Sequence, residues 1–239
     1  MITIYFGLPR SGKSTLICRM LKKNIDLRNK LYKKALKKKN PKKWFMSHCK
    51  YDSFYANMDN KLCPNVDPAE LGVKWVYPDR SLVLIDEAGI QYNSRKTLSL
   101  PQSTIAYLKL HGHYKSDLCY FSQTWEDIDV TLRRLAERYY YIKKVGPFTM
   151  IRRIKKVIMI NEEKQIIDGF EFFHWWLRIL PYPFKVKDAI QFVFRPPYYK
   201  YFDSYSKMNV PQRDFKSDQQ NSNARGARTG SPDIAKAVQ

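Results

Sequence analysis

Acidic residues are scarce in this chain of 239 residues. Asp and Glu number only 22 against 43 Lys and Arg, which gives a formal net charge of +21. A chain with so large an excess of positive charge attracts polyanions and negatively charged surfaces. We therefore expect an anionic partner, either a nucleic acid or an anionic membrane surface.

Long hydrophobic runs are also lacking. No stretch approaches the ~20 apolar residues that a membrane-spanning helix needs, and the N-terminus lacks the basic region and cleavage site of a secretory signal. The most apolar segment, 170–184, is interrupted by Glu171, His174, Arg178 and two prolines. It is typical of a buried core segment, although its aromatic residues would also suit the headgroup boundary of a membrane. These absences predict a cytoplasmic protein without a transmembrane helix in this chain.

Cysteine is rare, and its spacing excludes the common zinc motifs. The four residues, Cys18, Cys49, Cys63 and Cys119, form no Cys-x-x-Cys pair. His48 followed by Cys49 and Cys63 does not match a common zinc spacing either. We expect reduced thiols, as in a cytosolic protein, with Cys18 and Cys119 in apolar surroundings.

Short apolar runs alternate with helical patterns through about residue 145. Such alternation is typical of α/β proteins in which helices flank a parallel, doubly wound sheet. Two extended runs then flank a turn at 161–163 and predict a β-hairpin, and the last residues are mostly polar. We therefore predict an α/β domain (1–145), a β-rich extension of the same domain (146–203) and a polar, disordered tail (204–239).

The expected elements follow from the period of the apolar residues and from the turn residues between them. Strands are expected at 2–6, 53–57, 75–77, 81–85, 118–122, 139–144, 148–160 and 165–173. Helices are expected at 12–23, 102–111 and 128–138.

A basic segment covers 22–43. It holds eleven Lys or Arg residues and one acid, Asp26, and we expect it to end at Pro41. Leu27, Leu31 and Leu36 give it some helical amphipathicity. It is either a solvated helix face or mobile loop, or a surface that contacts the phosphates of DNA or of anionic lipids.

The segment 7–14, GLPRSGKS, matches the Walker A pattern GxxxxGK[ST] in full. It follows an expected strand and precedes an expected helix, which is the setting that this motif requires. Its glycines let backbone N–H groups surround a phosphate, and the helix N-terminus adds its dipole. Lys13 would reach the β- and γ-phosphates, Ser14 would ligate Mg²⁺, and Thr15 would contact the α-phosphate side. The residues predicted to bind ATP are Gly7, Arg10, Ser11, Gly12, Lys13, Ser14 and Thr15.

The segment 82–87, LVLIDE, matches a Walker B strand. Asp86 would hold Mg²⁺, and Glu87 would act as general base on the attacking water. The alternative is a buried strand followed by a helix-capping acidic pair. An acidic pair suits hydrolysis coupled to mechanical work better than it suits a simple kinase.

Other polar residues have two interpretations each. Gln123 follows the strand expected at 118–122, where an amide can sense the γ-phosphate or bond the backbone. Arg133, Arg134 and Arg95 are candidates for an arginine finger across a subunit interface, or surface residues. Of these arginines, Arg133 is the one that we predict to be catalytic.

The histidines at 111 and 113 are candidate metal ligands or phosphate contacts. A structural or hydrogen-bonding role for His111 and His113 is the simpler expectation.

With these residues in hand, the sequence resembles the N-terminal ATPase domain of the zonular occludens toxin (Zot) family, which includes filamentous-phage assembly proteins. The resemblance covers residues 2–145. The motifs that carry it are GLPRSGKST, SFYAN, YPDRSLVLIDEAG with Arg95 after it, LHGHYKSDLCYFSQ and DIDVTLRRLAERYYYI.

The resemblance implies an assembly ATPase at the cytoplasmic face of the host inner membrane, with a fold similar to that of FtsK/HerA-like motors. Lys13, Ser14, Asp86, Glu87 and Gln123 match the positions that serve nucleotide in that family. The chain departs from the family in two ways. Gly112 stands where the family often has Arg, and the family's usual transmembrane helix and periplasmic part are not evident.

We therefore predict an ATPase that uses ATP and Mg²⁺ in filamentous phage morphogenesis, during extrusion of single-stranded DNA. Single-stranded DNA or phage coat and assembly proteins are the expected partners, with a homo-oligomer and a peripheral contact with the host inner membrane. One alternative is a cytosolic DNA-packaging translocase. Another is a non-catalytic, nucleotide-switched scaffold or nucleic-acid-binding protein whose tyrosines could stack on bases.

Overall fold

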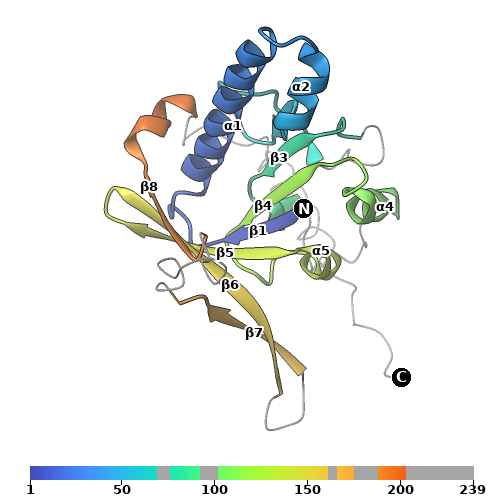
Figure 1. Cartoon of the computed structure of the whole chain (residues 1–239). Coiled ribbons are helices and arrows are strands. Elements are labelled where there is room, and N and C mark those ends of the chain that lie inside the picture. The colour runs from blue at the N-terminus through green and yellow to red at the C-terminus, as the bar shows by residue number, and fades with distance from the viewer. Residues whose placement is uncertain (69–75, 92–101, 161–165, 175–187, 203–239) are drawn as a thin grey trace, which may run out of the picture. The chain divides into compact units, whose positions relative to one another are not determined.

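A mixed β-sheet organises the chain. The computed structural model describes residues 1–68, 76–91, 102–160, 166–174 and 188–202. Within these residues eight strands form one sheet in the order β2-β3-β4-β1-β5-β6-β7, with β8 also paired to β6 (Figure 1). The strands are β1 (Ile2–Phe6), β2 (Ser53–Ala56), β3 (Ser81–Ile85), β4 (Asp117–Ser122), β5 (Arg138–Val145), β6 (Phe148–Ile160), β7 (Ile166–Phe172) and β8 (Ile190–Phe194).

The first five strands are parallel and the last three are antiparallel. β1 lies between β4 and β5 and runs parallel to both, and β3 joins β2 to β4 in the same direction. β6 then reverses against β5, and β7 and β8 both pair antiparallel with β6. The predicted α/β class with a mainly parallel sheet is confirmed, and so is the hairpin formed by β6 and β7.

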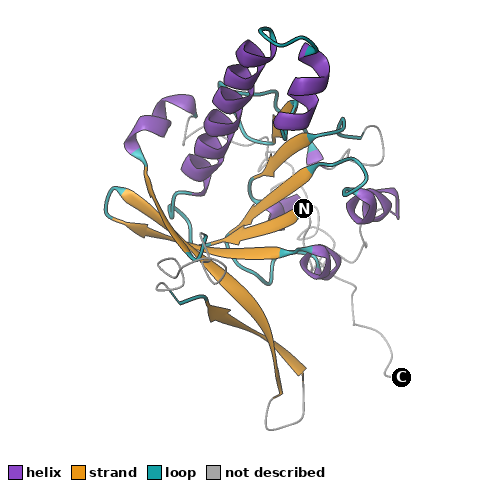
Figure 2. Ribbon diagram, viewed as in Figure 1, coloured by secondary structure: helices purple, strands orange, loops and turns teal. Residues whose placement is uncertain are grey.

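Helices cover both faces of the parallel part of the sheet (Figure 2). The helices are α1 (Lys13–Ala35), α2 (Pro41–His48), α3 (Ala88–Gln91), α4 (Gln102–Leu110), α5 (Val130–Leu135) and the 3₁₀ helix η3 (Pro196–Tyr201). One core cluster packs α1 against the sheet, and the other packs α4 and α5 against the opposite face.

Strand β3 explains the two cores. Its five residues are all buried, with Leu82 and Leu84 on the α1 side and Val83 and Ile85 on the other. Successive side chains of a strand point to opposite faces, so a strand with four consecutive apolar residues, as at 82–85, must be covered on both. The continuous run SLVLI therefore fixes β3 as a central strand.

The basic segment is helical over most of its length. Helix α1 continues to Ala35, twelve residues past the predicted end at position 23, and Pro41 begins α2 rather than ending the segment. Proline suits the first turn of a helix because its missing N–H has no partner there in any case. The apolar spacing of Leu27, Leu31 and Leu36 therefore predicts this part of the helix correctly. The many lysines between these residues make the helical pattern harder to recognise.

Other expectations need correction. The helix expected at 128–138 is shorter, because Asp129 caps α5 at Thr131 and β5 already begins at Arg138. Residues 76 and 77 are not in a strand. Strand β8 and η3 were not expected at all, since their prolines and scattered aromatics gave no clear period.

Two of the sequence predictions fall largely where nothing is described. The apolar segment 170–184 is described only to 174, and its Phe172 is exposed at the end of β7. The tail predicted at 204–239 lies outside the described residues. Among the helices that are described, none is long and apolar enough to cross a membrane.

Candidate functional site

The carboxyl ends of three neighbouring strands bring the predicted site residues together. Parallel pairing aligns Phe6 of β1 with Ser122 of β4, and Ile85 of β3 with Tyr120 of β4. The segments that follow these strands therefore leave the sheet at the same edge. In open α/β sheets this edge is where ligands bind.

The loop after β1 leads directly into helix α1. Gly12 precedes the helix in a left-handed conformation (φ 100°), and the helix has neither a side-chain cap nor an acid in its first turn. The Ser11 hydroxyl is buried without a hydrogen-bond partner in the described structure. A long helix thus presents uncapped N–H groups and an unpaired hydroxyl at one point, which suits an anion.

Lys13 is a buried cation at the centre of this loop. Its ammonium donates to the carbonyl oxygen of Gly7 at 3.0 Å and lies 3.5 Å from that of Leu8. Its charged partner is Glu87, whose Oε1 lies 3.7 Å away. The ammonium is therefore held at the loop by neutral carbonyls and one loosely placed carboxylate.

Asp86 and Ser14 face each other across the site. The Ser14 hydroxyl donates to Asp86 Oδ2 at 3.0 Å, and the Glu87 backbone N–H donates to Oδ1 at 3.0 Å. Burial raises the pKa of Asp86 from 3.8 to about 6, and the neighbouring Glu87 carboxylate adds to the rise. These two hydrogen bonds and the charge of Lys13 oppose that rise without cancelling it.

Glu87 lies between Lys13 and Gln123. It has a positive φ of 48°, which is uncommon for a residue with a side chain and occurs at functional sites. Gln123 Nε2 donates to Glu87 Oε2 at 3.3 Å. The side chains that follow β1, β3 and β4 thus form one chain of polar contacts, Lys13–Glu87–Gln123.

Sequence reasoning missed Asn57, which fixes the end of β3. Its side-chain amide donates to the Asp86 carbonyl at 2.8 Å, and its Oδ1 accepts from the Asp86 N–H at 2.5 Å. This pair of hydrogen bonds between the Asn57 side chain and the Asp86 backbone holds the main chain of Asp86 in place. The available signal was its position as the last, polar residue of the strand expected at 53–57; in the structure β2 ends at Ala56, and Asn57 follows it beside the Asp86 strand.

Strands β5, β6 and β8 form the outer wall of the loop. A Cβ on Gly7 would overlap the carbonyl oxygen of Ile142, and one on Gly12 would overlap the Thr149 hydroxyl. Thr149 Oγ1 donates to the Ser11 carbonyl at 3.3 Å, while Arg195 packs its aliphatic chain near Gly12. The glycines are thus required by neighbours as well as by the path of the loop.

Arg133 is engaged within its own chain. Its guanidinium lies over the Trp125 ring, 5.4 Å from the centroid, whereas Arg134 on the next position of α5 is exposed. Arg95 lies outside the described residues. Arg10, in the loop itself, is exposed and has a positive φ of 61°.

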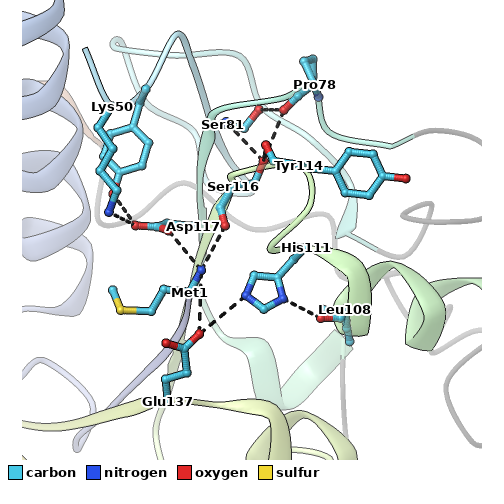
Figure 3. Close-up of polar contacts among 11 residues, drawn as sticks. Met1, Lys50, Pro78, Ser81, Leu108, His111, Tyr114, Ser116, Asp117 and Glu137 are labelled. Atoms are coloured by element: carbon cyan, nitrogen blue, oxygen red, sulfur yellow. Dashed lines mark hydrogen bonds and ion pairs between the residues drawn. The ribbon is translucent and has the colours of Figure 1, made fainter. Parts of the chain in front are cut away.

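His111 lies at the opposite edge of the sheet, with the amino ends of the strands (Figure 3). Its Nδ1 lies 2.7 Å from the Leu108 carbonyl oxygen and its Nε2 3.8 Å from Glu137. His113 is exposed, and its backbone N–H donates to the Leu110 carbonyl at 2.8 Å. These contacts tie His111 to α4 and to the start of β5, on the edge away from Asp86.

The residues present fit Mg²⁺ and a polyphosphate. Asp86 and Ser14 offer the hard oxygen ligands that Mg²⁺ prefers, and a divalent cation would relieve the buried charge of Asp86. Lys13, the uncapped helix and the free Ser11 hydroxyl supply positive charge and donors for phosphate oxygens.

Comparison with known proteins gives a family and several distant structural likenesses. The family model for the zonular occludens toxin (Zot) matches residues 1–172. No curated protein matches the chain.

The N-terminal domain of zonular occludens toxin from Neisseria meningitidis shares 16% identity, covers 75% of this chain and 97% of its own, and superposes with a TM-score of 0.41. B204, the DNA-packaging ATPase from Sulfolobus Turreted Icosahedral Virus, has 14% identity, coverage of 70% and 95%, and a TM-score of 0.38. The flagellar accessory protein FlaH from Methanocaldococcus jannaschii has 10% identity, coverage of 70% and 88%, and a TM-score of 0.39. Likenesses this distant add no argument about what the chain binds.

The match to the family model, and not the structural likenesses, assigns the chain to a family. Because that model spans 1–172 of the 239 residues, the chain belongs to the zonular occludens toxin family.

Proposed function

We propose that the chain is an ATP-hydrolysing assembly factor for filamentous phage, which acts in the export of single-stranded DNA. The observation that carries the ATPase part is the meeting of Lys13, Ser14, Asp86 and Glu87 at one edge of the sheet. Membership of a family that includes filamentous-phage assembly proteins supports the assembly role.

Each residue of the site has a role in this proposal. The loop 7–15 and Lys13 hold the phosphates, and Ser14 with Asp86 holds Mg²⁺. The metal would neutralise phosphate charge and orient the nucleotide. Glu87 accepts a proton from the attacking water, because its carboxylate is partly exposed and its side-chain partners among the described residues are Lys13 and Gln123.

Gln123 positions Glu87 or senses the γ-phosphate through the contact that joins them. An arginine from a second copy of the chain would complete the site. Arg133 is the candidate predicted from the sequence, and the exposed Arg134 beside it lacks the Trp125 contact that engages Arg133.

The test is steady-state hydrolysis of ATP by the full chain with Mg²⁺. Lys13→Ala and Glu87→Gln should each lower kcat by at least about 100-fold, because one loses a phosphate contact and the other the general base. Exposed Lys109→Ala is the matched control and should turn over normally.

Unchanged turnover in Glu87→Gln would refute the proposed base, and a wild-type chain without any turnover would leave a nucleotide-switched scaffold. Stimulation by single-stranded DNA without membranes would favour a packaging translocase over an export factor.

A further inference from the structure

The outer side of helix α1 carries a stripe of lysines away from the ATP site. Lys23, Leu27, Lys30 and Lys34 follow one another at intervals of four, three and four residues, so they share one face of the helix. All four are exposed, and Leu27 is 48% exposed. The stripe lies roughly a third of a turn around the helix from Ile17, which packs on the sheet.

The stripe continues around the turn into α2. Leu36 is 61% exposed at the end of α1, and Met46 on α2 is 49% exposed. The exposed lysines between these two apolar residues are Lys37, Lys38, Lys39, Lys42 and Lys43. We call the surface formed by 23–46 the basic hairpin; its turn forms the top of the molecule as drawn in Figure 1.

The described residues compensate almost none of this charge. Lys22 pairs with Asp26 at 2.5 Å, and no other lysine of 22–43 makes an ion pair with any residue that the structure describes. An uncompensated cluster of this size is complementary to a polyanion.

The side chains of the basic hairpin fit a lipid surface better than a nucleic acid. Its one arginine, Arg28, is turned to the body of the protein, where it donates to the Asp52 carbonyl at 3.0 Å. Arginine rather than lysine is the residue that matches phosphate geometry in nucleic-acid sites. The basic hairpin therefore offers point charges, which a fluid layer of headgroups can meet in any arrangement.

The aromatic rings of the basic hairpin are also occupied. Trp44 stacks on His48 with centroids 4.1 Å apart, and Lys38 lies over the Trp44 ring at 5.8 Å. Tyr32 packs edge-on against Phe45. Tyr32 is 56% exposed, but its ring already has Phe45 as a partner, whereas the exposed Leu27, Leu36 and Met46 are aliphatic and suit acyl chains better than bases.

We propose that the basic hairpin is a docking surface for an anionic membrane. Its lysines bind acidic headgroups, and Leu27 and Leu36 enter the boundary with the acyl chains. The surface would place the proposed assembly factor at a membrane, but its binding does not require the ATP site.

The experiment is sedimentation of the full chain with vesicles of phosphatidylcholine containing about one third phosphatidylglycerol. The variant Lys30→Gln/Lys34→Gln/Lys37→Gln should bind roughly 100-fold more weakly, because it loses three charges at the headgroups. The control Lys109→Gln/Lys143→Gln/Lys144→Gln removes the same charge from exposed positions outside the basic hairpin and should bind like the wild type. Equal binding by both variants, or no binding by the wild type, would overturn the assignment.

A second variant separates lipid from DNA. Leu27→Ser/Leu36→Ser should lower vesicle binding about tenfold and leave binding of a dT oligonucleotide unchanged. Unchanged vesicle binding would mean that the basic hairpin only collects polyanions by charge, and the membrane assignment would fall.

ATP hydrolysis without vesicles should be normal in both hairpin variants, and Lys13→Ala should keep its vesicle binding. Failure of the membrane assignment is thereby distinguishable from failure of the proposed ATPase.

Discussion

Two aspartates at opposite edges of the sheet are equally buried and have opposite electrostatics. Asp86 follows β3 and Asp117 begins β4, and each is 6% exposed. The pKa of Asp86 is raised to about 6, while that of Asp117 lies below its ordinary value. Burial acts on both in the same direction, so their partners must account for the difference.

Asp117 has cations and a phenol around it (Figure 3). Burial would raise its pKa, but hydrogen bonds at 2.5 Å from Lys50 and from Tyr51, and one at 3.1 Å from the Met1 amino group, outweigh burial. Among the described residues, the Asp86 carboxylate accepts hydrogen bonds from the Ser14 hydroxyl and a backbone N–H, feels the charge of Lys13 and has a second carboxylate next to it.

Within the described residues, the charge of Asp117 at the amino ends of the strands is thus compensated, whereas that of Asp86 at the carboxyl ends is compensated less. An incomplete site with a perturbed carboxyl group is typical of a place where a charged ligand binds. The comparison supports the proposed Mg²⁺ site, and three changes test it, beginning with the one of largest expected effect.

Gly7→Ala should destabilise the protein most. Its Cβ would overlap the Ile142 carbonyl oxygen of β5, so the backbone must shift where the loop leaves the sheet. We expect a loss of about 3 kcal/mol or more in the free energy of unfolding, measured by urea denaturation.

Gly112→Ala is the matched control at the other edge, because nothing lies within 4 Å of its added Cβ. It should change stability by no more than about 0.5 kcal/mol. A tolerated Gly7→Ala would show that the wall formed by β5 does not constrain the loop.

Asp117→Asn should cost less, about 2 kcal/mol at pH 7, because the amide has one acceptor oxygen in place of two and lacks the charge that strengthens these hydrogen bonds. A lowered pKa means that the carboxylate stabilises the fold above the unfolded pKa of about 3.9. This contribution disappears as the pH falls through the still lower folded pKa.

Urea denaturation at pH 7 and in strong acid should therefore show the difference from wild type shrinking at low pH. The exposed Asp59→Asn serves as the control. A difference that stays constant with pH would mean that packing, not charge, explains the loss.

The sequence predicted the site better than its surroundings. Lys13, Ser14, Asp86 and Glu87 sit in short patterns attached to apolar strands, and parallel pairing then brings them together whatever the rest of the chain does. Asn57 could have been found by the same rule, as a polar residue just after a strand at the same edge.

Thr149 and Arg195 could not be found in that way. Thr149 meets Ser11 across 138 residues of chain, through antiparallel strands whose register no local pattern sets. Arg195 depends on β8, whose five residues follow a proline-broken segment. Long-range pairing of this kind decides what encloses the loop, and periodicity carries no information about it.

Asp86→Asn should have the smallest effect and the opposite sign. A raised pKa means that the ligand-free fold loses stability as the pH rises from the unfolded pKa near 3.9 through the folded pKa of about 6. At pH 8 the neutral amide avoids this cost, and we expect the variant to be more stable than wild type by about 1–2 kcal/mol. Near pH 4 the folded carboxyl is largely protonated and the unfolded one is only about half ionised, so the two proteins should differ by no more than about 0.5 kcal/mol.

Adding Mg²⁺ and ATP should reverse the order at pH 8. The wild type should gain thermal stability because a cation compensates the Asp86 carboxylate, and the variant should gain much less because its amide is a weak Mg²⁺ ligand. Thermal denaturation of the wild type and the variant at pH 4 and pH 8, with and without Mg²⁺ and ATP, measures both the effect of pH and the effect of the ligands on stability. If Asp86→Asn were less stable than wild type at pH 8 without ligand, the Asp86 carboxylate would already be compensated within the chain. Asp86 and Asp117 would then not differ in the way that the directions of their pKa shifts indicate.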